Sequence, residues 1–235
     1  MTESIRGFVR KALRVGRAEL LDLPLALIQN WPGRLGNALR VNYYRARLKH
    51  AGRHLRIGRA VMIVGPEQIS LGHHVSIDDN VVLIAGALQG LEERIYRKPN
   101  NSFRYTEGQL VIGNHVHIAP HVVIQAHGGV SIGSELTVAA GAKIYSLSHH
   151  YRDPGNPAGR SDYRFVGGVP AAEQLLVIGP VTIGDAAAIG LNAVLLPGAD
   201  VPEGSWVAAG AVVSGRIPQG HVLTVHGELK PKSGP

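Results

Sequence analysis

From Ile57 onward, aliphatic residues return at every sixth position, a period that belongs to neither an α-helix nor an alternating strand. Glycine often follows the aliphatic residue, and a small or branched apolar residue stands four positions after it. Such a unit is typical of a short strand and a sharp corner, where glycine permits unusual backbone angles. The aliphatic positions are Ile57, Ile63, Ile69, Leu71, Ile77, Leu83, Ile112, Ile118, Ile124, Ile132, Val138, Ile144, Val177, Ile183, Ile189, Leu195, Val201, Val207 and Val213.

Three of these units predict one triangular coil of about 18 residues, and stacked coils bury a continuous aliphatic column, as solenoids do. Two stretches interrupt the repeat, residues 86–110 and residues 149–176. We expect both to be loops that leave the prism. Long loops on a rigid scaffold are where binding and catalysis are usually placed.

The N-terminal segment has a helical period instead. Its apolar residues form one stripe and its basic residues lie largely on the other side, which is the pattern of a helix lying on a membrane surface. A helix packed on its own domain shows the same stripe, so both interpretations stay open. A turn at residues 31–33 precedes a second predicted helix, Leu39 to Leu48, that ends near Gly52. The stripe consists of Ile5, Phe8, Val9, Ala12, Leu13 and Leu20.

The sequence therefore divides into a basic helical arm (1–56), a β-helix domain (57–218) and a C-terminal tail (219–235). Net charge is +7, but residues 1–60 hold 13 Lys and Arg against 3 Asp and Glu, while the remainder holds 11 against 14. The basicity thus belongs to the arm and does not indicate a nucleic-acid partner. No apolar stretch reaches the roughly 18 residues of a membrane span, so we expect a cytoplasmic protein whose arm is the only candidate for contact with the membrane.

The chain contains no cysteine. This excludes a disulfide framework, a thiolate nucleophile and cysteine-ligated zinc or iron–sulfur sites.

The stretch GPVTIGDAAAIGLNAVLLPGADVPEGSWVAAGAVV, residues 179–213, resembles the C-terminal coils of the hexapeptide-repeat O-acetyltransferases that act on sugars. That family includes the galactoside and maltose acetyltransferases and those of polysaccharide biosynthesis. The resemblance implies an all-β fold, a left-handed parallel β-helix of hexapeptide repeats with an N-terminal helical arm. The left hand comes from the resemblance alone, because parallel crossovers are nearly always right-handed.

In this family the coil before the large loop ends in a catalytic histidine, and here that segment reads IYSLSHHYRDP, residues 144–154. The resemblance places His149 there, with His150 as the competing assignment. A neutral imidazole takes the proton of a sugar hydroxyl as the hydroxyl attacks a thioester. The family commonly has Asn or Asp in the preceding coil, where this chain has Ala119. Asp78 holds the equivalent place one coil earlier.

We expect Asp78 to contact the acceptor. Asp153 either orients the histidine or forms a turn with Pro154 and Gly155.

Acetyl-CoA in this family lies along the C-terminal coils between two subunits of a homotrimer. The resemblance places Arg216 near its phosphates, and Lys230 and Lys232 near the adenosine 3′-phosphate, where cations suit the charge. The chain departs from the family at Ala188, a common tryptophan position, and at its C-terminal tail. The residues expected along the pantetheine are Gly190, Asn192, Ala193, Ala209 and Gly210.

Two other classes remain alternatives: a metal protein like the γ-carbonic anhydrases, and a non-catalytic trimeric β-helix scaffold. His115, His121 and His127 occupy the same place in successive six-residue units, so we expect them on three different faces. Zinc requires about three convergent histidines, and the sequence offers no complete set.

The sequence therefore predicts an acetyl-CoA-dependent O-acetyltransferase that uses no metal and transfers directly within a ternary complex. The acceptor is expected to be a small-molecule or lipid-linked sugar. An amine acceptor and a longer acyl group stay open, because the histidine serves each of them.

Overall fold

The computed structural model describes residues 23–88, 95–166 and 169–232. The apolar stripe from Ile5 to Leu20 lies outside these residues. Residues 23–28 are helical, and α2 spans Gly33–Arg45. The predicted second helix is therefore confirmed in kind, but it begins six residues earlier than expected and ends three earlier. Pro32 has an extended backbone at the start of α2. Proline is tolerated there because the backbone N–H groups of the first helical turn have no partner within the helix, so the missing N–H of proline costs no hydrogen bond.

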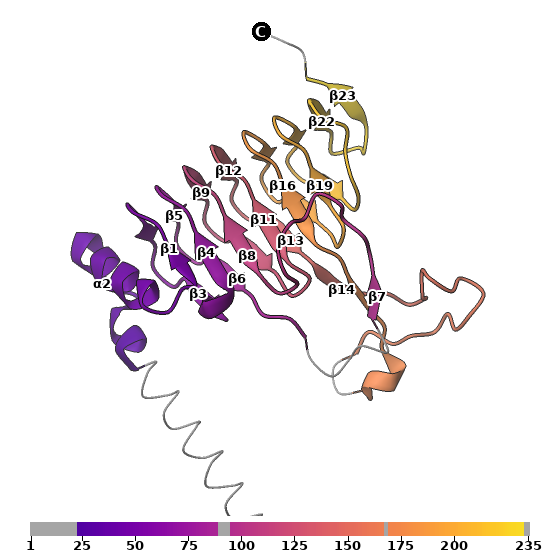
Figure 1. The fold of residues 1–235 in the computed structure, drawn as a ribbon, viewed down its shortest axis with the longest axis horizontal. Coiled ribbons are helices and arrows are strands. Elements are labelled where there is room, and N and C mark those ends of the chain that lie inside the picture. The colour runs from indigo at the N-terminus through magenta and orange to yellow at the C-terminus, as the bar shows by residue number, and fades with distance from the viewer. Residues whose placement is uncertain (1–22, 89–94, 167–168, 233–235) are drawn as a thin grey trace, which may run out of the picture.

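Helix α2 covers the N-terminal end of the prism (Figure 1). Its buried Arg40 donates to the backbone carbonyls of Ile57 at 3.0 Å and Trp31 at 2.8 Å. Desolvation lowers the pKa of Arg40, and the four bonded carbonyls, including those of Ile28 and Gln29, satisfy its buried donors. The helix thus closes the open end of the aliphatic column.

The chain then winds into three sheets that form the sides of a prism, and their strands are parallel except for β23, which pairs antiparallel with β22 at the end of one sheet (Figure 1). Sheet A contains β1 (His50–Ala51), β4 (Ile69–Leu71), β8 (Leu110–Ile112), β11 (Val130–Ile132), β16 (Val181–Ile183) and β19 (Asp200–Val201). Sheet B contains β2 (Arg56–Ile57), β5 (Ser76–Ile77), β9 (Val116–Ile118), β12 (Leu136–Val138), β17 (Ala188–Ile189), β20 (Trp206–Val207), β22 (His221–Leu223) and β23 (Leu229–Pro231). Sheet C contains β3 (Met62–Val64), β6 (Val82–Ile84), β10 (Val123–Gln125), β13 (Lys143–Tyr145), β18 (Val194–Leu195) and β21 (Val212–Val213).

The six-residue aliphatic positions fill the core, as predicted. Ile57, Ile77, Ile118 and Ile124 are completely buried, and Ile63 packs against the core at its edge. One member of the series differs. Val177 lies in β15 (Leu176–Ile178), which pairs outside the prism.

The coils are not all of the expected length. Thr182 pairs with Asp200, which is a coil of 18 residues, but Val116 pairs with Leu136, which is a coil of 20. The two extra residues lie at the corner between sheets C and A, where the step from Ile124 to Ile132 replaces the usual six residues by eight. Both interruptions of the repeat also leave the prism at this wide corner.

The glycines act differently from the prediction. Within the part of the chain that the structure describes, nine non-glycine residues, including His74 and Asn192, have φ between 51° and 62° at the corners. A Cβ on Gly113 would lie 2.7 Å from the backbone of Gly133, and one on Gly190 would lie 2.5 Å from that of Ala209. The repeat glycines are therefore required because successive coils approach closely, rather than because of unusual backbone angles.

Sheet pairing extends beyond the predicted domain boundaries. Strand β1 lies within residues 1–56 and pairs with β4 of the predicted β-helix domain. Strands β22 and β23 lie within residues 219–235 and extend sheet B. Gly52, directly after β1, continues the column of repeat glycines, since a Cβ there would lie 2.2 Å from the carbonyl oxygen of Gly72, whereas β22 is followed by Thr224. Within the described ranges, no helix has the length and hydropathy of a membrane span.

Candidate active site

The two long interruptions meet beside the wide corner. Strand β7 (Ile95–Arg97) belongs to the first, and β14 (Leu147–His149) and β15 belong to the second. Strand β15 pairs antiparallel with β14 and parallel with β7, which forms a small three-stranded sheet outside the prism (Figure 1). Residues 86–110 and 149–176 therefore build one structural unit, which the sequence did not indicate.

His149 ends β14, and its imidazole is held by a chain of hydrogen bonds. Its Nε2 lies 3.2 Å from Oε1 of Gln174, and Nε2 of Gln174 donates to the carbonyl of Val169 at 3.0 Å. Because the amide oxygen is an acceptor, Nε2 of His149 is the protonated nitrogen in this arrangement. The Nδ1 atom then keeps its lone pair and is able to accept a proton.

The surroundings of His149 differ from those of His150. The ring of Phe165 lies 4.6 Å from the half-buried His149 ring. His150 is exposed, stacks on Tyr151 at 4.8 Å, and uses Nδ1 in contacts with the backbone of Arg152. Neighbouring residues of a strand point to opposite sides, so only one of the pair contacts Gln174.

Asp153 forms a local turn. Its Oδ1 accepts from the backbone N–H of Gly155 at 2.8 Å, and the residue lines a cavity with Tyr96 and Tyr163. Among the described residues, no hydrogen bond joins Asp153 to His149. This geometry corresponds to the turn-forming alternative.

Asp78 follows β5 and faces outward from sheet B. Its Oδ2 lies 2.7 Å from Nε2 of His117, and its Oδ1 is bonded to Arg56. Sheet B is the side of the triangle opposite the wide corner, so within one chain Asp78 is far from His149.

The residues expected along the pantetheine lie together at the corner between sheets B and C. Asn192, Ala209 and Gly210 are exposed there, and the N–H of Gly210 donates to Leu191 at 2.8 Å. The Ala193 side chain belongs to the core and is completely buried. The corner therefore offers backbone and small side chains, with Ala193 as a supporting residue.

The three expected cations lie elsewhere. Lys230, on β23, pairs with Glu228 at 2.9 Å, and Nζ of Lys232 lies 5.0 Å from the centroid of the Trp206 ring. Arg216 pairs with Asp200 at 2.6 Å. The structure thus brings together the residues expected along the pantetheine, but it does not bring together the three cations expected at the phosphates.

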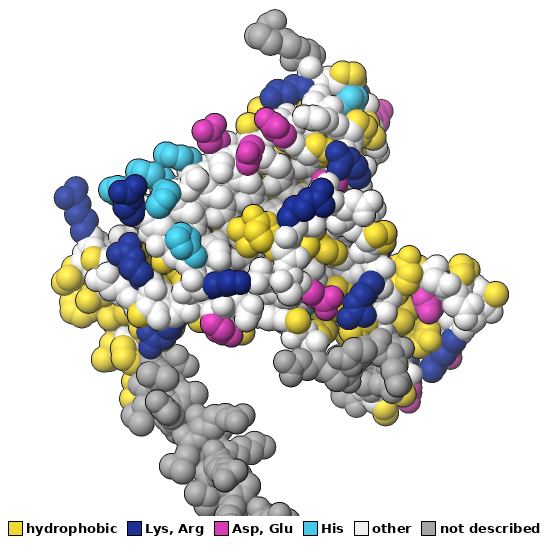
Figure 2. Space-filling view, viewed as in Figure 1, with side chains coloured by type: hydrophobic (Ala, Val, Ile, Leu, Met, Phe, Trp, Pro, Cys, Tyr) yellow, Lys and Arg dark blue, Asp and Glu magenta, His cyan; other side chains and the backbone are white. Residues whose placement is uncertain are grey.

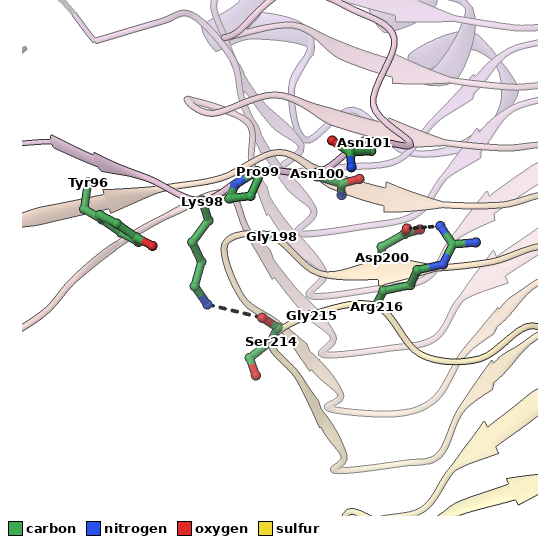
Figure 3. Close-up of a pocket in the computed structure, with 10 residues that line it drawn as sticks. All are labelled: Tyr96, Lys98, Pro99, Asn100, Asn101, Gly198, Asp200, Ser214, Gly215 and Arg216. Atoms are coloured by element: carbon green, nitrogen blue, oxygen red, sulfur yellow. Dashed lines mark hydrogen bonds and ion pairs between the residues drawn. The ribbon is translucent and has the colours of Figure 1, made fainter. Parts of the chain in front are cut away.

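Arg216 belongs to a network that fastens residues 98–105 across sheet A. Buried Asp200 accepts from Thr182 at 2.7 Å, from Ser102 at 2.7 Å and from Arg216. The amide of Asn100 donates to three acceptors beneath it, at 3.0 to 3.2 Å. Figure 3 shows the Arg216 guanidinium turned toward Asp200.

Lys98 lies in the same cavity and was not singled out from the sequence. Its Nζ donates to the carbonyl of Ser214 at 3.2 Å (Figure 3). Nothing in the sequence marked Lys98 as a candidate, because it lies in an interruption of the repeat, where the six-residue spacing assigns no position to a residue.

The described residues contain no group of three or more His, Asp or Glu side chains arranged to hold a metal ion. His115, His121 and His127 lie at three different corners of the prism, as their spacing predicts. A different set stacks instead. The ring of His74 lies 4.5 Å from that of His54 and 4.7 Å from that of His115, and the parallel rings do not converge on one point.

No protein-family model matches the chain. Over 165 residues, 70% of its length, the chain is 27% identical to the dTDP-4-amino-4,6-dideoxy-D-glucose acyltransferase of Escherichia coli, and the match covers 71% of that protein.

Two solved structures show the fold. AntD from Bacillus cereus, an N-acyltransferase in complex with dTDP and 3-hydroxybutyryl-CoA, superposes with a TM-score of 0.61 at 16% identity, over 81% of this chain and 85% of that one. A maltose O-acetyltransferase from Clostridium difficile superposes with a TM-score of 0.53 at 15% identity, over 95% and 89%.

These comparisons confirm the resemblance stated from residues 179–213. The homologues of this chain are sugar acyltransferases of the hexapeptide-repeat type. The prism is accordingly the left-handed parallel β-helix of the hexapeptide-repeat acetyltransferases. Among the neighbours, AntD holds an acyl-CoA.

Proposed function

We propose that the chain transfers an acetyl group from acetyl-CoA to a sugar hydroxyl, with His149 as the general base, by direct transfer in a ternary complex. The observation that carries this proposal is the hydrogen-bond chain from Val169 through Gln174 to His149. It orients the imidazole and leaves Nδ1 unprotonated, which is what a general base requires.

In this reaction the acceptor oxygen forms a bond to the thioester carbonyl carbon while its proton moves to Nδ1 of His149. The tetrahedral intermediate then collapses, the carbon–sulfur bond breaks, and the thiolate of CoA takes the proton from the imidazolium. His149 is neutral again at the end of the cycle.

The donor contacts proposed here follow the exposed corner between sheets B and C. Asn192, Ala209 and Gly210 leave room there for a narrow chain such as pantetheine. Arg216 is already paired with Asp200. Lys98 lies apart from the donor corner, in the cavity at the corner between sheets C and A, and donates only to a backbone carbonyl among its described contacts, so we assign it to a phosphate group on that side of the prism.

We also propose a homotrimer that associates through sheet C. The outward row of this sheet is apolar over most of its length, and Met62 and Val212 are 45% and 56% exposed. Contiguous exposed apolar residues mark protein–protein interfaces. By strand register the row is Met62, Val82, Val123, Lys143, Val194 and Val212.

Transfer to a sugar amine is a second candidate, because the curated relative is named for an aminosugar substrate and AntD is an N-acyltransferase. A histidine base serves either acceptor, since the attacking hydroxyl or amine must lose a proton in both reactions. The acceptor that supports thiol release, a neutral sugar or an aminosugar, therefore distinguishes the two reactions.

The test is thiol release from acetyl-CoA with neutral sugars, nucleotide sugars and aminosugars as acceptors. We expect His149→Ala to lower the rate with a hydroxyl acceptor by about 10² to 10⁴. His150→Ala is the matched control and should stay within about twofold, because its ring contacts only local backbone and Tyr151. Full activity of His149→Ala with a hydroxyl acceptor would overturn the assignment.

A further inference from the structure

The outer face of sheet B carries a polar row that the proposed reaction does not use. Strand register places its members side by side, one from each successive coil. Arg56 bonds both to the hydroxyl of Ser76, at 2.8 Å, and to Asp78. In order along the sheet, the row is Arg56, Ser76, His117, Thr137, Ala188 and Trp206.

A shallow groove runs along this row. Ser76, His117, Thr137 and Ala188 form its floor, and Trp206 closes one end. The stacked corner residues His74 and His115, followed by Glu135, form one side. Figure 2 shows the histidines gathered over the first coils, near α2, with acidic side chains further along the same edge.

The polar centre of the groove is a fixed pair. Nε2 of His117 donates to Oδ2 of Asp78 at 2.7 Å, so its Nδ1 is left as an acceptor. The His117 side chain is 44% exposed, whereas that of Asp78 is 16% exposed. The pair therefore presents an acceptor nitrogen to solvent on a base that cannot rotate freely.

Trp206 provides the apolar end. Its ring is 47% exposed, and the ammonium of Lys232 lies near it at 5.0 Å. An exposed indole beside hydroxyl and carboxylate groups suits a ligand with an apolar face and a polar rim. A pyranose ring has such a face of C–H bonds and a rim of hydroxyls that both donate and accept.

The charges in the groove favour a neutral ligand over a phosphorylated one. The carboxylate of Glu135 lines the groove, and that of Asp78 is bonded to His117 on its floor. Desolvation, followed by the neighbouring rings of His54 and His115, lowers the pKa of His74. The lowered pKa disfavours the charged form of the central ring of the stack, and Arg56 is occupied by Asp78.

The length of the groove indicates a chain of sugars. His117 and Trp206 are separated by three strand spacings, about 14 Å. This exceeds a single pyranose ring, so a ligand that reaches both ends has at least two linked residues.

We propose that the outer face of sheet B is a second carbohydrate site, which binds a neutral oligosaccharide between the His117–Asp78 pair and Trp206. Within one chain it lies on the side of the prism opposite the wide corner and His149, while its Asp78 edge borders the corner between sheets B and C that we assign to the donor. The site holds the ligand by hydrogen bonds and ring contact, and no bond of the ligand is broken there.

The experiment measures binding without acetyl-CoA, so it does not depend on the proposed acyl transfer. The chain contains two tryptophans, and Trp31→Phe leaves Trp206 as the only indole reporter. Maltotriose, cellotriose and chitotriose are titrated against its fluorescence, with dTDP and CoA as anionic competitors. The expected result is saturable quenching by at least one trisaccharide that neither dTDP nor CoA displaces.

Two variants locate the site. His117→Ala should weaken trisaccharide binding at least tenfold. Leu35→Ala, an exposed position on α2, should leave the affinity unchanged within about twofold, as expected for surface substitutions. Saturation-transfer NMR on Trp206→Ala, which removes the reporter, should show the same loss as His117→Ala.

The proposal is overturned if none of the three saccharides binds, if CoA or dTDP displaces the bound one, or if His117→Ala binds as tightly as its parent. A chain that binds a trisaccharide but releases no thiol from acetyl-CoA would refute the proposed acyl transfer and leave this site standing.

Discussion

Sheets B and C present the same kind of aliphatic residue to the core and different residues to solvent. Ile118 on β9 and Ile124 on β10 are both completely buried, whereas the outward neighbours are His117 on one sheet and Val123 on the other. The inward row is dictated by the shape of the prism, so it repeats in every coil. The outward row is free to vary, and it is there that the two faces acquire different partners.

The difference has a simple chemical meaning. A face of histidine, carboxylate, hydroxyl and a single indole offers hydrogen-bond partners to a polar ligand. A face of valine and methionine stabilises a complex only when its apolar surface is removed from water. We therefore assign a small polar ligand to sheet B and further copies of the chain to sheet C.

The largest effect is expected from a charge placed on sheet C. Val82→Asp should prevent association, because its register neighbours Met62 and Val123 are apolar and a carboxylate buried between subunits without a partner is strongly unfavourable. Light scattering should show the mass falling to that of one chain. Thr137→Asp, at an outward position of sheet B, is the matched control and should keep the mass of the wild type. An unchanged mass in Val82→Asp would mean that sheet C is not the interface.

A second pair of variants tests whether the inward rows are equivalent. Ile118→Ala and Ile124→Ala should each lower the free energy of unfolding by about 2 to 5 kcal/mol, because each leaves a cavity in a well-packed column. Chemical denaturation measures both. If one of them costs less than about 1 kcal/mol, the two inner faces do not share one core and the comparison between sheets loses its basis.

The smallest effect concerns Asp79, at the corner that joins the two sheets. The backbone N–H of Arg59, at 2.7 Å, and then its guanidinium lower the pKa of Asp79. A lowered pKa means that the carboxylate stabilises the fold above its unfolded value near 3.9. This contribution is lost as the pH falls through the folded pKa.

Asp79→Asn keeps the oxygen that accepts from the backbone and removes the charge. Since the Asp79 side chain is 36% exposed, solvent screening limits the effect to less than about 1 kcal/mol at pH 7. Thermal unfolding at pH 7 and at pH 3 should show a lower transition temperature for the variant at pH 7 and a smaller difference at pH 3. An equal difference at both values would assign the effect to packing rather than to charge.

The fold was largely predictable because one residue in six must face a narrow aliphatic column, and that demand is visible directly in the spacing from Ile57 to Val213. The coil length was predicted less well, since two extra residues at the wide corner leave the inward series intact. Helix α2 was placed too late because Gly33 and Gly36, which have low helix propensity, lie in its first turns.

The candidate site was predictable in part. His149 was found by resemblance, but Gln174 was not, since nothing in the sequence indicates that β15 returns antiparallel beside β14. The His117–Asp78 pair was missed for a related reason. The interruption at 86–110 separates the two residues in sequence, although Asp78 follows one inward isoleucine and His117 precedes the next on the same sheet.

The sequence by itself therefore determined the parallel coils, the aliphatic column, the two interruptions and the histidine at the edge of the second. All of these depend on local spacing or on short motifs. The tertiary structure alone decided which residues on different coils meet: Gln174 with His149, Asp200 with Arg216, and Asp78 with His117. The physical reason is that neighbours across a coil are set by strand register, and register depends on how many residues each corner and each loop inserts.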